Sequence, residues 1–395
     1  MTPLRSRLAL LGTTAAVLAG CAAGPQGPHV TTGATAVHKT AHVVHEVAPG
    51  DLNGDGQTDF AVSGRVGEGE GFSSLQVVEA GRFRSELRLQ YELPQLATGD
   101  FDADGHTDFA GLSGPAARND VRIFYGRDGH FPQTATRTAR PGEARTLAAG
   151  DITGDGVTDL VVGYKTFREQ DNIAVFPGGP DRNRGGRPRM YRAPGVPIAS
   201  LAADVDGDGD TDLALLRADR QVQVLANRGG RLRQASAYSY GSAASGERLQ
   251  ATLTTGDFDD DGDADLAVAD AREQPVFLFS GDTQPALAGT YRFAGRAPVD
   301  LAAVNLDKRG GADLMVLLGE ENPELRTLQI ASDGNGLTFR AVGHQTLEEL
   351  AVARRLHVTD FDQSGPLDAV IWGGSVEDPR VLTVRGMRIV HPEAE

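Results

Sequence analysis

Seven short acidic segments hold the residues of this chain best suited to chemistry, because their carboxylates recur at a fixed spacing. Each segment is a nine-residue frame whose second residue is apolar, sixth is Gly and ninth is Asp. The frames begin at Asp51, Asp100, Asp151, Asp204, Asp257, Asn305 and Asp360, so successive starts lie 49, 51, 53, 53, 48 and 55 residues apart. A pattern that returns seven times at nearly one period indicates an internal repeat.

The frame has the composition of a cation-binding loop. Oxygen side chains at places one, three and five, a main-chain carbonyl at place seven and both oxygens of Asp at place nine can converge on one point. Gly at place six allows the positive φ that closes the turn. Six or seven oxygens about 2.3–2.6 Å from a centre suit Ca²⁺, whereas Mg²⁺ needs stricter octahedral geometry and thiolate-preferring metals need other ligands. An EF-hand would need Glu at place twelve and flanking helices, and neither is expected here.

The segments between frames predict the elements that position these loops. Each frame leads into a short apolar run such as FAVSG or LVVGY, then a second β-rich run, a more polar third strand and a small apolar strand before the next frame. No segment has a sustained helical period. Four short strands in about 50 residues are typical of one propeller blade. The sequence therefore predicts an all-β fold, a seven-bladed β-propeller of four-stranded antiparallel blades over residues 41–395. The last unit can supply its own outer strands, and an added strand from residues near 30–40 is left open.

The repeated frame resembles the FG-GAP/VCBS repeat, the calcium-loop blade of integrin α-subunit head propellers and of many bacterial exported proteins. In that family the loop joins two adjacent strands of a blade on one face of the disc. Carried over by position, the resemblance implies five intact calcium sites, with the residue at place seven acting through its carbonyl. They are Asp51, Asn53, Asp55, Gln57 and Asp59; Asp100, Asp102, Asp104, His106 and Asp108; Asp151, Thr153 (a weaker ligand), Asp155, Val157 and Asp159; Asp204, Asp206, Asp208, Asp210 and Asp212; and Asp257, Asp259, Asp261, Asp263 and Asp265.

Two frames depart from this pattern. In the sixth, Arg309 replaces the carboxylate at place five, and because a guanidinium there repels Ca²⁺, we expect no metal. In the seventh, Ser364 takes that place and leaves Asp360, Asp362 and Asp368, so its occupancy is left open. The expected cofactor is thus Ca²⁺ at five sites, or six if the seventh loop is occupied.

The N-terminus has the pattern of a bacterial lipoprotein signal. Arg5 and Arg7 precede an apolar run of about 11 residues, too short to span a bilayer, which ends in Leu-Ala-Gly-Cys21. This resembles a lipobox, and the alternative is an ordinary signal peptide with an incidental Cys. We expect residues 1–20 to be removed, Cys21 to be lipidated and residues 21–40 to form a flexible tether. The protein would then be exported and anchored at the outer face of the bacterial cytoplasmic membrane.

The acidic composition is largely explained by the loops. The formal net charge is −16, but 21 of the 54 acidic residues lie in the five intact frames. An acidic surface argues against a nucleic-acid partner. We expect a monomer that binds a protein or glycan as an adhesion or scaffold module. A lectin is the alternative, although aromatic residues make up only 6% of the chain.

A polysaccharide-acting enzyme is the less favoured alternative, because no nucleophile with a base and no paired carboxylates outside the loops stand out. His130, His344 and His357 are isolated and are interpreted as strand or turn residues.

One segment, GGPDRNRGGRPR, is basic in this acidic chain and carries Arg182, Arg184, Arg187 and Arg189. It is interpreted as a solvated turn, with a docking patch for an anionic partner as the alternative.

Overall fold

All regular elements in the described part of the protein are β-strands. The computed structural model describes residues 28–33, 35–39, 43–65, 73–79, 82–89, 92–113, 120–126, 134–137, 142–166, 172–180, 187–241, 251–271, 275–281, 286–319, 322–332, 336–360, 364–374 and 378–390. Within these residues there is no helix of the length and apolarity that crossing a membrane requires. The predicted signal (1–20) and Cys21 lie outside them.

The first half of the described chain forms three antiparallel sheets, each built from four consecutive strands. The first sheet contains β3 (Val43–Gly50), β4 (Asp59–Arg65), β5 (Ser73–Glu79) and β6 (Arg82–Leu89). The second contains β7 (Gln95–Gly99), β8 (Asp108–Leu112), β9 (Val121–Phe124) and β10 (Thr134–Arg137). The third contains β11 (Glu143–Gly150), β12 (Asp159–Lys165), β13 (Ile173–Phe176) and β14 (Arg189–Tyr191).

Three further sheets repeat this order. The fourth contains β15 (Pro197–Ala203), β16 (Asp212–Arg217), β17 (Gln221–Asn227) and β18 (Leu232–Ser239). The fifth contains β19 (Ala251–Gly256), β20 (Asp265–Asp270), β21 (Pro275–Ser280) and β22 (Ala286–Arg292), and the sixth contains β23 (Pro298–Val304), β24 (Asp313–Leu318), β25 (Glu324–Ser332) and β26 (Leu337–Thr346). The prediction of an all-β fold made of four-stranded antiparallel sheets is confirmed.

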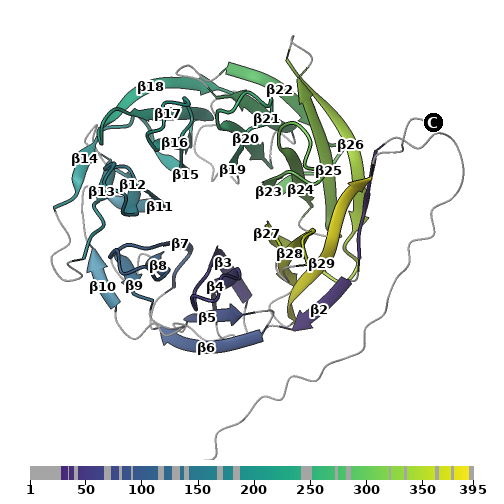
Figure 1. Ribbon diagram of the computed structural model, residues 1–395, viewed down its shortest axis with the longest axis horizontal. Coiled ribbons are helices and arrows are strands. Elements are labelled where there is room, and N and C mark those ends of the chain that lie inside the picture. Colours follow the sequence, from purple (N-terminus) through teal and green to yellow (C-terminus); the bar gives the residue numbers. More distant parts are fainter. Residues whose placement is uncertain are drawn as a thin grey trace, which may run out of the picture.

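The seventh sheet differs, because it combines the two ends of the described chain. Its chain-terminal strands are β27 (Ala353–Thr359), β28 (Leu367–Gly374) and the long β29 (Pro379–Val390), and it is completed by β1 (His29–Thr31) and β2 (Thr35–Lys39). Residue Thr35 pairs with Val384 and His29 with Val390, both antiparallel. This answers the question left open by the sequence. Part of the segment expected to be a tether adds strands to the last sheet, and Figure 1 shows β2 beside β29.

The seven sheets surround a common centre, with β3, β7, β11, β15, β19, β23 and β27 innermost (Figure 1). A buried hydrophobic cluster lies between each pair of neighbouring sheets. The cluster between the seventh and first sheets includes Trp372, whose ring meets Phe60 edge-on at a centroid distance of 5.9 Å. Because the first and last sheets share a core in this way, burial of apolar side chains continues around the whole circle.

Polar side chains also connect innermost strands across sheet boundaries. Asp300 accepts hydrogen bonds from the Thr252 hydroxyl (3.1 Å) and the Leu356 main-chain N–H (2.9 Å), which links the fifth, sixth and seventh sheets. Arg355 then donates from Nε and Nη2 to the two carboxylate oxygens of Glu46, at 2.9 and 3.1 Å, and reaches the first sheet. Bidentate charge-assisted contacts of this kind fix orientation as well as adding energy. The contacts therefore hold the junction where the chain ends meet.

Candidate metal centres

Each acidic frame lies between the innermost strand of a sheet and the next strand. The residue before the frame pairs with the Asp at its ninth place, as in Gly50 with Asp59 and Thr359 with Asp368. The fourth and fifth loops approach each other, since a Cβ built on Gly207 would collide with the carboxylate of Asp263. The frames thus join adjacent strands of a sheet, as the resemblance implied.

The first aspartate of the frame accepts hydrogen bonds from main-chain N–H groups of its own loop and so stabilises the turn. In the first loop Asp51 accepts the main-chain N–H groups of Gly54 (2.8 Å), Asp55 (3.1 Å) and Gly56 (2.9 Å). The residue at place six has positive φ in all seven frames, at Gly56, Gly105, Gly156, Gly209, Gly262, Gly310 and Gly365. The predicted need for glycine at this place is confirmed, because an L side chain would be strained there.

The ninth aspartate is buried in every frame, and in the second to fifth frames it joins the loop to the end of the third strand of the sheet. Asp108 accepts the N–H of Phe101 (2.9 Å) on one oxygen and that of Gly126 (2.7 Å), just after β9, on the other. Equivalent pairs of contacts are made by Asp159, Asp212 and Asp265. The sequence analysis assigned this residue to metal binding alone. Its second role, as a connector to the third strand, requires long-range contacts and has no signal in the nine-residue frame.

Burial makes the ninth carboxylates costly to ionise without a cation. Burial raises the pKa of Asp108 to about 7 and of Asp212 and Asp265 to about 6, against the opposing effect of their main-chain hydrogen bonds. The pKa of Asp159 is also raised by burial. A bound divalent cation would favour the charged forms, because an opposite charge at a few ångströms stabilises a carboxylate.

Three of the predicted sites bring their carboxylates together tightly enough to hold a metal ion. Oxygens of the residues at places one, three and nine lie within 4.8 Å of one another in the second, fourth and fifth loops, at Asp100, Asp102 and Asp108; Asp204, Asp206 and Asp212; and Asp257, Asp259 and Asp265. Oδ1 of Asp204, of Asp206 and of Asp259 is buried and has no hydrogen-bond partner among the described residues. Burying a carboxylate oxygen without a hydrogen bond costs free energy, and a bound cation would offset this cost. These oxygen ligands therefore fit a hard cation such as Ca²⁺.

The first and third loops use a neutral residue at place three. Asn53 accepts the N–H of Asp55 at 2.8 Å and donates from Nδ2 to Asp55 at 3.2 Å. The Thr153 hydroxyl lies 3.5 Å from Oδ1 of Asp159, to which it donates. These side chains therefore lie among the carboxylates of their loops, as the predicted ligand sets require, but they bring less negative charge.

The fourth loop contains a cation of its own, which the sequence analysis missed. Arg228, in the turn between β17 and β18, donates from Nη2 to Asp206 at 2.6 Å and from Nη1 to Asp208. The neighbouring Gly229 donates its N–H to Asp210 at 2.9 Å. The guanidinium thus lies against two of the predicted calcium ligands. Its presence could have been suspected only from the basic turn NRGG.

The two divergent frames are arranged differently. In the sixth, Asp307 accepts the main-chain N–H of Arg309 (2.9 Å) and the Gln329 amide (3.0 Å), so amide donors surround this carboxylate. In the seventh, Oδ1 of Asp360 is buried without a hydrogen bond within the described residues, and Oδ2 accepts the N–H of Gly365 at 2.9 Å. Asp362 lies outside the described residues, so the occupancy of this loop stays open.

The predicted basic patch is described only in part. Arg182 and Arg184 lie outside the described residues, Arg187 is exposed, and Arg189 begins β14. Arg189 donates from Nη1 to the carbonyl of Gly230 at 2.9 Å, and so connects the third and fourth sheets. This residue is therefore a contact between units in addition to a surface charge.

A cavity of about 1070 Å³ lies at the centre of the ring. Its walls are the innermost strands, and its charged lining residues include Glu46, Asp300, Arg354 and Arg355. Burial raises the pKa of Asp300 to about 6 and lowers the pKa of His357 to about 4. His344 and His357 lie in strands β26 and β27, as predicted, whereas His130 is outside the described residues.

Comparison with known proteins supports the repeat and the fold. The family described as FG-GAP-like repeat matches residues 100–162 and 204–268, which contain the second to fifth loops. No curated protein matches the sequence. Two crystal structures of BBS1N in complex with ARL6DN, soaked with lead and with mercury, superpose with a TM-score of 0.61. They are 13% and 12% identical to this chain. The matches cover 90% and 91% of this chain, and 95% and 97% of the chains in those two structures. At this identity the likeness shows the fold alone. Residues 100–162 and 204–268 therefore match the FG-GAP-like repeat, in a chain whose fold is β-propeller-like.

Proposed function

We propose that this protein is a seven-bladed, calcium-stabilised β-propeller that serves as a non-catalytic binding or scaffold module. The observation that carries the proposal is the repeated acidic loop, with buried carboxylate oxygens at Asp204, Asp206 and Asp259 to which no described residue donates a hydrogen bond. A loop that recurs seven times, each time between the two inner strands of a sheet, has a structural role. The ring of loops and the central cavity then offer surfaces on which a partner can dock.

Calcium would be held by the loops that begin at Asp51, Asp100, Asp151, Asp204 and Asp257. When bound, it supplies positive charge that balances the clustered carboxylates. The chain's own residues do the rest. The first aspartate holds the turn, the ninth joins the loop to the sheet, and in the fourth loop Arg228 must leave Asp206 and Asp208 before a metal enters. The sixth loop, with Arg309, takes no metal in this proposal.

Export and membrane anchoring through lipidated Cys21 complete the proposal. The supporting observation is the arginine-flanked apolar run that ends at the chain's single cysteine. Because β1 begins at His29, only a short segment would separate the anchor from the folded ring. The ring would then lie close to the outer face of the membrane as a monomer, with its partner, a protein or a glycan, outside the cell.

Calcium titration by isothermal calorimetry tests the metal part of this function, with about five bound ions expected per chain. Absence of binding at millimolar calcium would contradict it. Membrane fractionation of wild type and Cys21→Ser, with mass spectrometry of the N-terminal peptide, tests the anchor. The binding role is tested on arrays of glycans and envelope proteins with and without calcium. Turnover of an arrayed ligand, in place of its retention, would contradict the non-catalytic assignment.

A further inference from the structure

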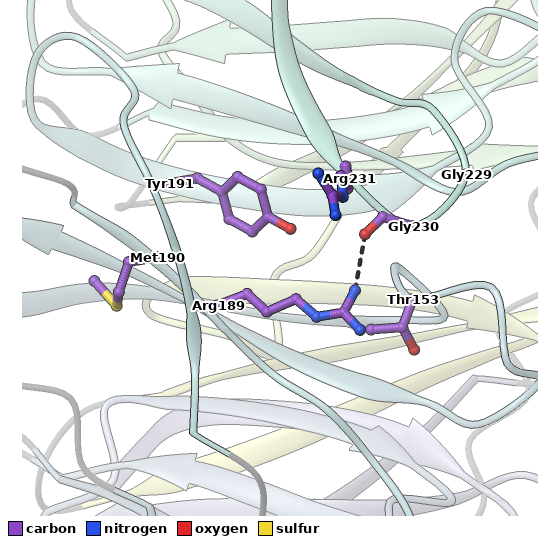
Figure 2. A pocket seen from close by; sticks show the side chains of 7 residues that line it. All are labelled: Thr153, Arg189, Met190, Tyr191, Gly229, Gly230 and Arg231. Carbon is purple, nitrogen blue, oxygen red and sulfur yellow. Dashed lines mark hydrogen bonds between the residues drawn. The ribbon is translucent and has the colours of Figure 1, made fainter.

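A second, smaller cavity lies between the third and fourth sheets, beside the third and fourth acidic loops, and no carboxylate is among its described lining residues. Its volume is about 580 Å³, within the range of small-molecule sites. Strand β14 forms one wall and the turn after β17 forms the other (Figure 2). The lining residues are Thr153, Arg189, Met190, Tyr191, Gly229, Gly230 and Arg231.

The alternation of side chains along β14 explains which residues face this cavity. Met190 packs against the hydrophobic cluster shared by the second and third sheets, whereas Tyr191 packs against the one shared by the third and fourth. Arg189, two residues from Tyr191, lies on the same face of the strand and reaches Gly230. Figure 2 accordingly shows Arg189, Tyr191 and Arg231 facing the turn, and Met190 pointing away.

The charge of the cavity is unusual for this acidic protein. Among the described residues, neither Arg189 nor Arg231 has a carboxylate within ion-pair distance, and the one hydrogen bond of Arg189 is to a main-chain carbonyl. Arg228, by contrast, is engaged by Asp206 and Asp208 on the other side of the turn. Two guanidiniums therefore lie together without a compensating anion, while the chain as a whole carries −16.

We propose that this cavity binds the phosphate group of a phosphate-bearing ligand. Guanidinium groups match phosphate oxygens with paired, charge-assisted hydrogen bonds, and two of them balance a phosphate dianion. The hydroxyl group of Tyr191, which lines the same space, adds a neutral donor. The inference rests on the proposed role as a binding module and names the chemistry of one ligand group. Free phosphate and a soluble phosphate monoester share that group.

The test titrates the purified full chain, stripped of calcium, with inorganic phosphate and with glycerol phosphate, by calorimetry. Removing calcium matters, because metal in the acidic loops would itself attract phosphate. Saturable binding of both probes is expected. Stronger binding of glycerol phosphate would identify an esterified phosphate, and stronger binding of inorganic phosphate would identify the free ion, and either result supports the site. No binding of either, or equal binding of acetate, would overturn it.

Variants locate the binding. Arg231→Gln removes a guanidinium that makes no hydrogen bond or ion pair with the described residues, and it should weaken phosphate binding at least about tenfold, since one charge-assisted hydrogen bond contributes about that factor. The double variant with Arg189→Gln should abolish it. Arg340→Gln, at an exposed arginine of β26 in the sixth sheet, is the matched control and should bind like wild type. Unchanged binding by Arg231→Gln and by the double variant would overturn the proposal. Calcium stabilisation measured on the same variants should persist, so failure here is distinguishable from failure of the proposed function.

Discussion

Removal of calcium should lower the thermal stability of this protein by a measurable amount. The second, fourth and fifth loops each place three carboxylate oxygens within 4.8 Å of one another, and their ninth aspartates are buried. Without a cation these like charges repel and lack solvation, so the folded state is destabilised. Excess chelator is therefore expected to shift the unfolding midpoint downward.

The size of the shift follows from mass action. At about 1 mM Ca²⁺ and a Kd of about 0.1 mM, typical of extracellular modules, each site adds about 1.4 kcal/mol. The three clustered sites then contribute about 4 kcal/mol and all five loops about 7 kcal/mol. Unfolding entropy for residues 41–395 is about 0.75 kcal/mol per kelvin, so the midpoint should fall by roughly 5 °C for three sites and 9 °C for five.

Differential scanning calorimetry at pH 7.5, in calcium and in excess EDTA, measures this shift. Mg²⁺ at the same concentration should restore less stability, because it tolerates the loop geometry poorly. Asp102→Asn should remove one site's share of the shift, whereas Asp307→Asn, the same place in the sixth loop, is the matched control and should leave the shift intact. A midpoint that moves by less than about 1 °C would refute the reasoning, given the size expected for even one site.

Four further outcomes are expected. Arg228→Gln should strengthen calcium binding at the fourth loop, and identical titration curves for variant and wild type would show that the guanidinium does not compete. Without calcium, the free energy of unfolding should fall as pH rises from about 4 to 7. The reason is that the pKa of Asp108 is raised to about 7 in the folded protein, so the folded state is favoured while this carboxyl is protonated. The fall should vanish with calcium, and a flat calcium-free profile would contradict this. Gly150→Ala should cost about 1–3 kcal/mol in denaturant unfolding, because the added Cβ would lie 2.6 Å from that of Ala202. Deletion of residues 28–39 should lower the midpoint through loss of two strands, which calorimetry would detect.

Much of the fold was predictable because its information is local. Three features act within nine residues: the glycine at place six, the first aspartate, which accepts neighbouring N–H groups, and the apolar residue at place two. Their pattern can therefore be recognised in the sequence alone. Gly56 and Asp51 illustrate this, since the φ of 79–81° at Gly54 and Gly56 and the hydrogen bonds to Asp51 match what the frame requires. The four strands per unit followed from the same repetition.

What the sequence by itself determined is thus the repeated unit, namely an acidic loop joining two apolar strands. Only the tertiary structure decided which strand completes the last sheet and which distant residues contact each loop. β2 pairs with β29 across nearly the whole chain, and Asp108 accepts the N–H of Gly126, just after β9. Arg228 enters the fourth loop from a hairpin that follows it, and Arg189 joins the next sheet through Gly230. The physical reason is that such partners are chosen by the stacking of sheets around a ring, which brings residues together regardless of their spacing in the chain.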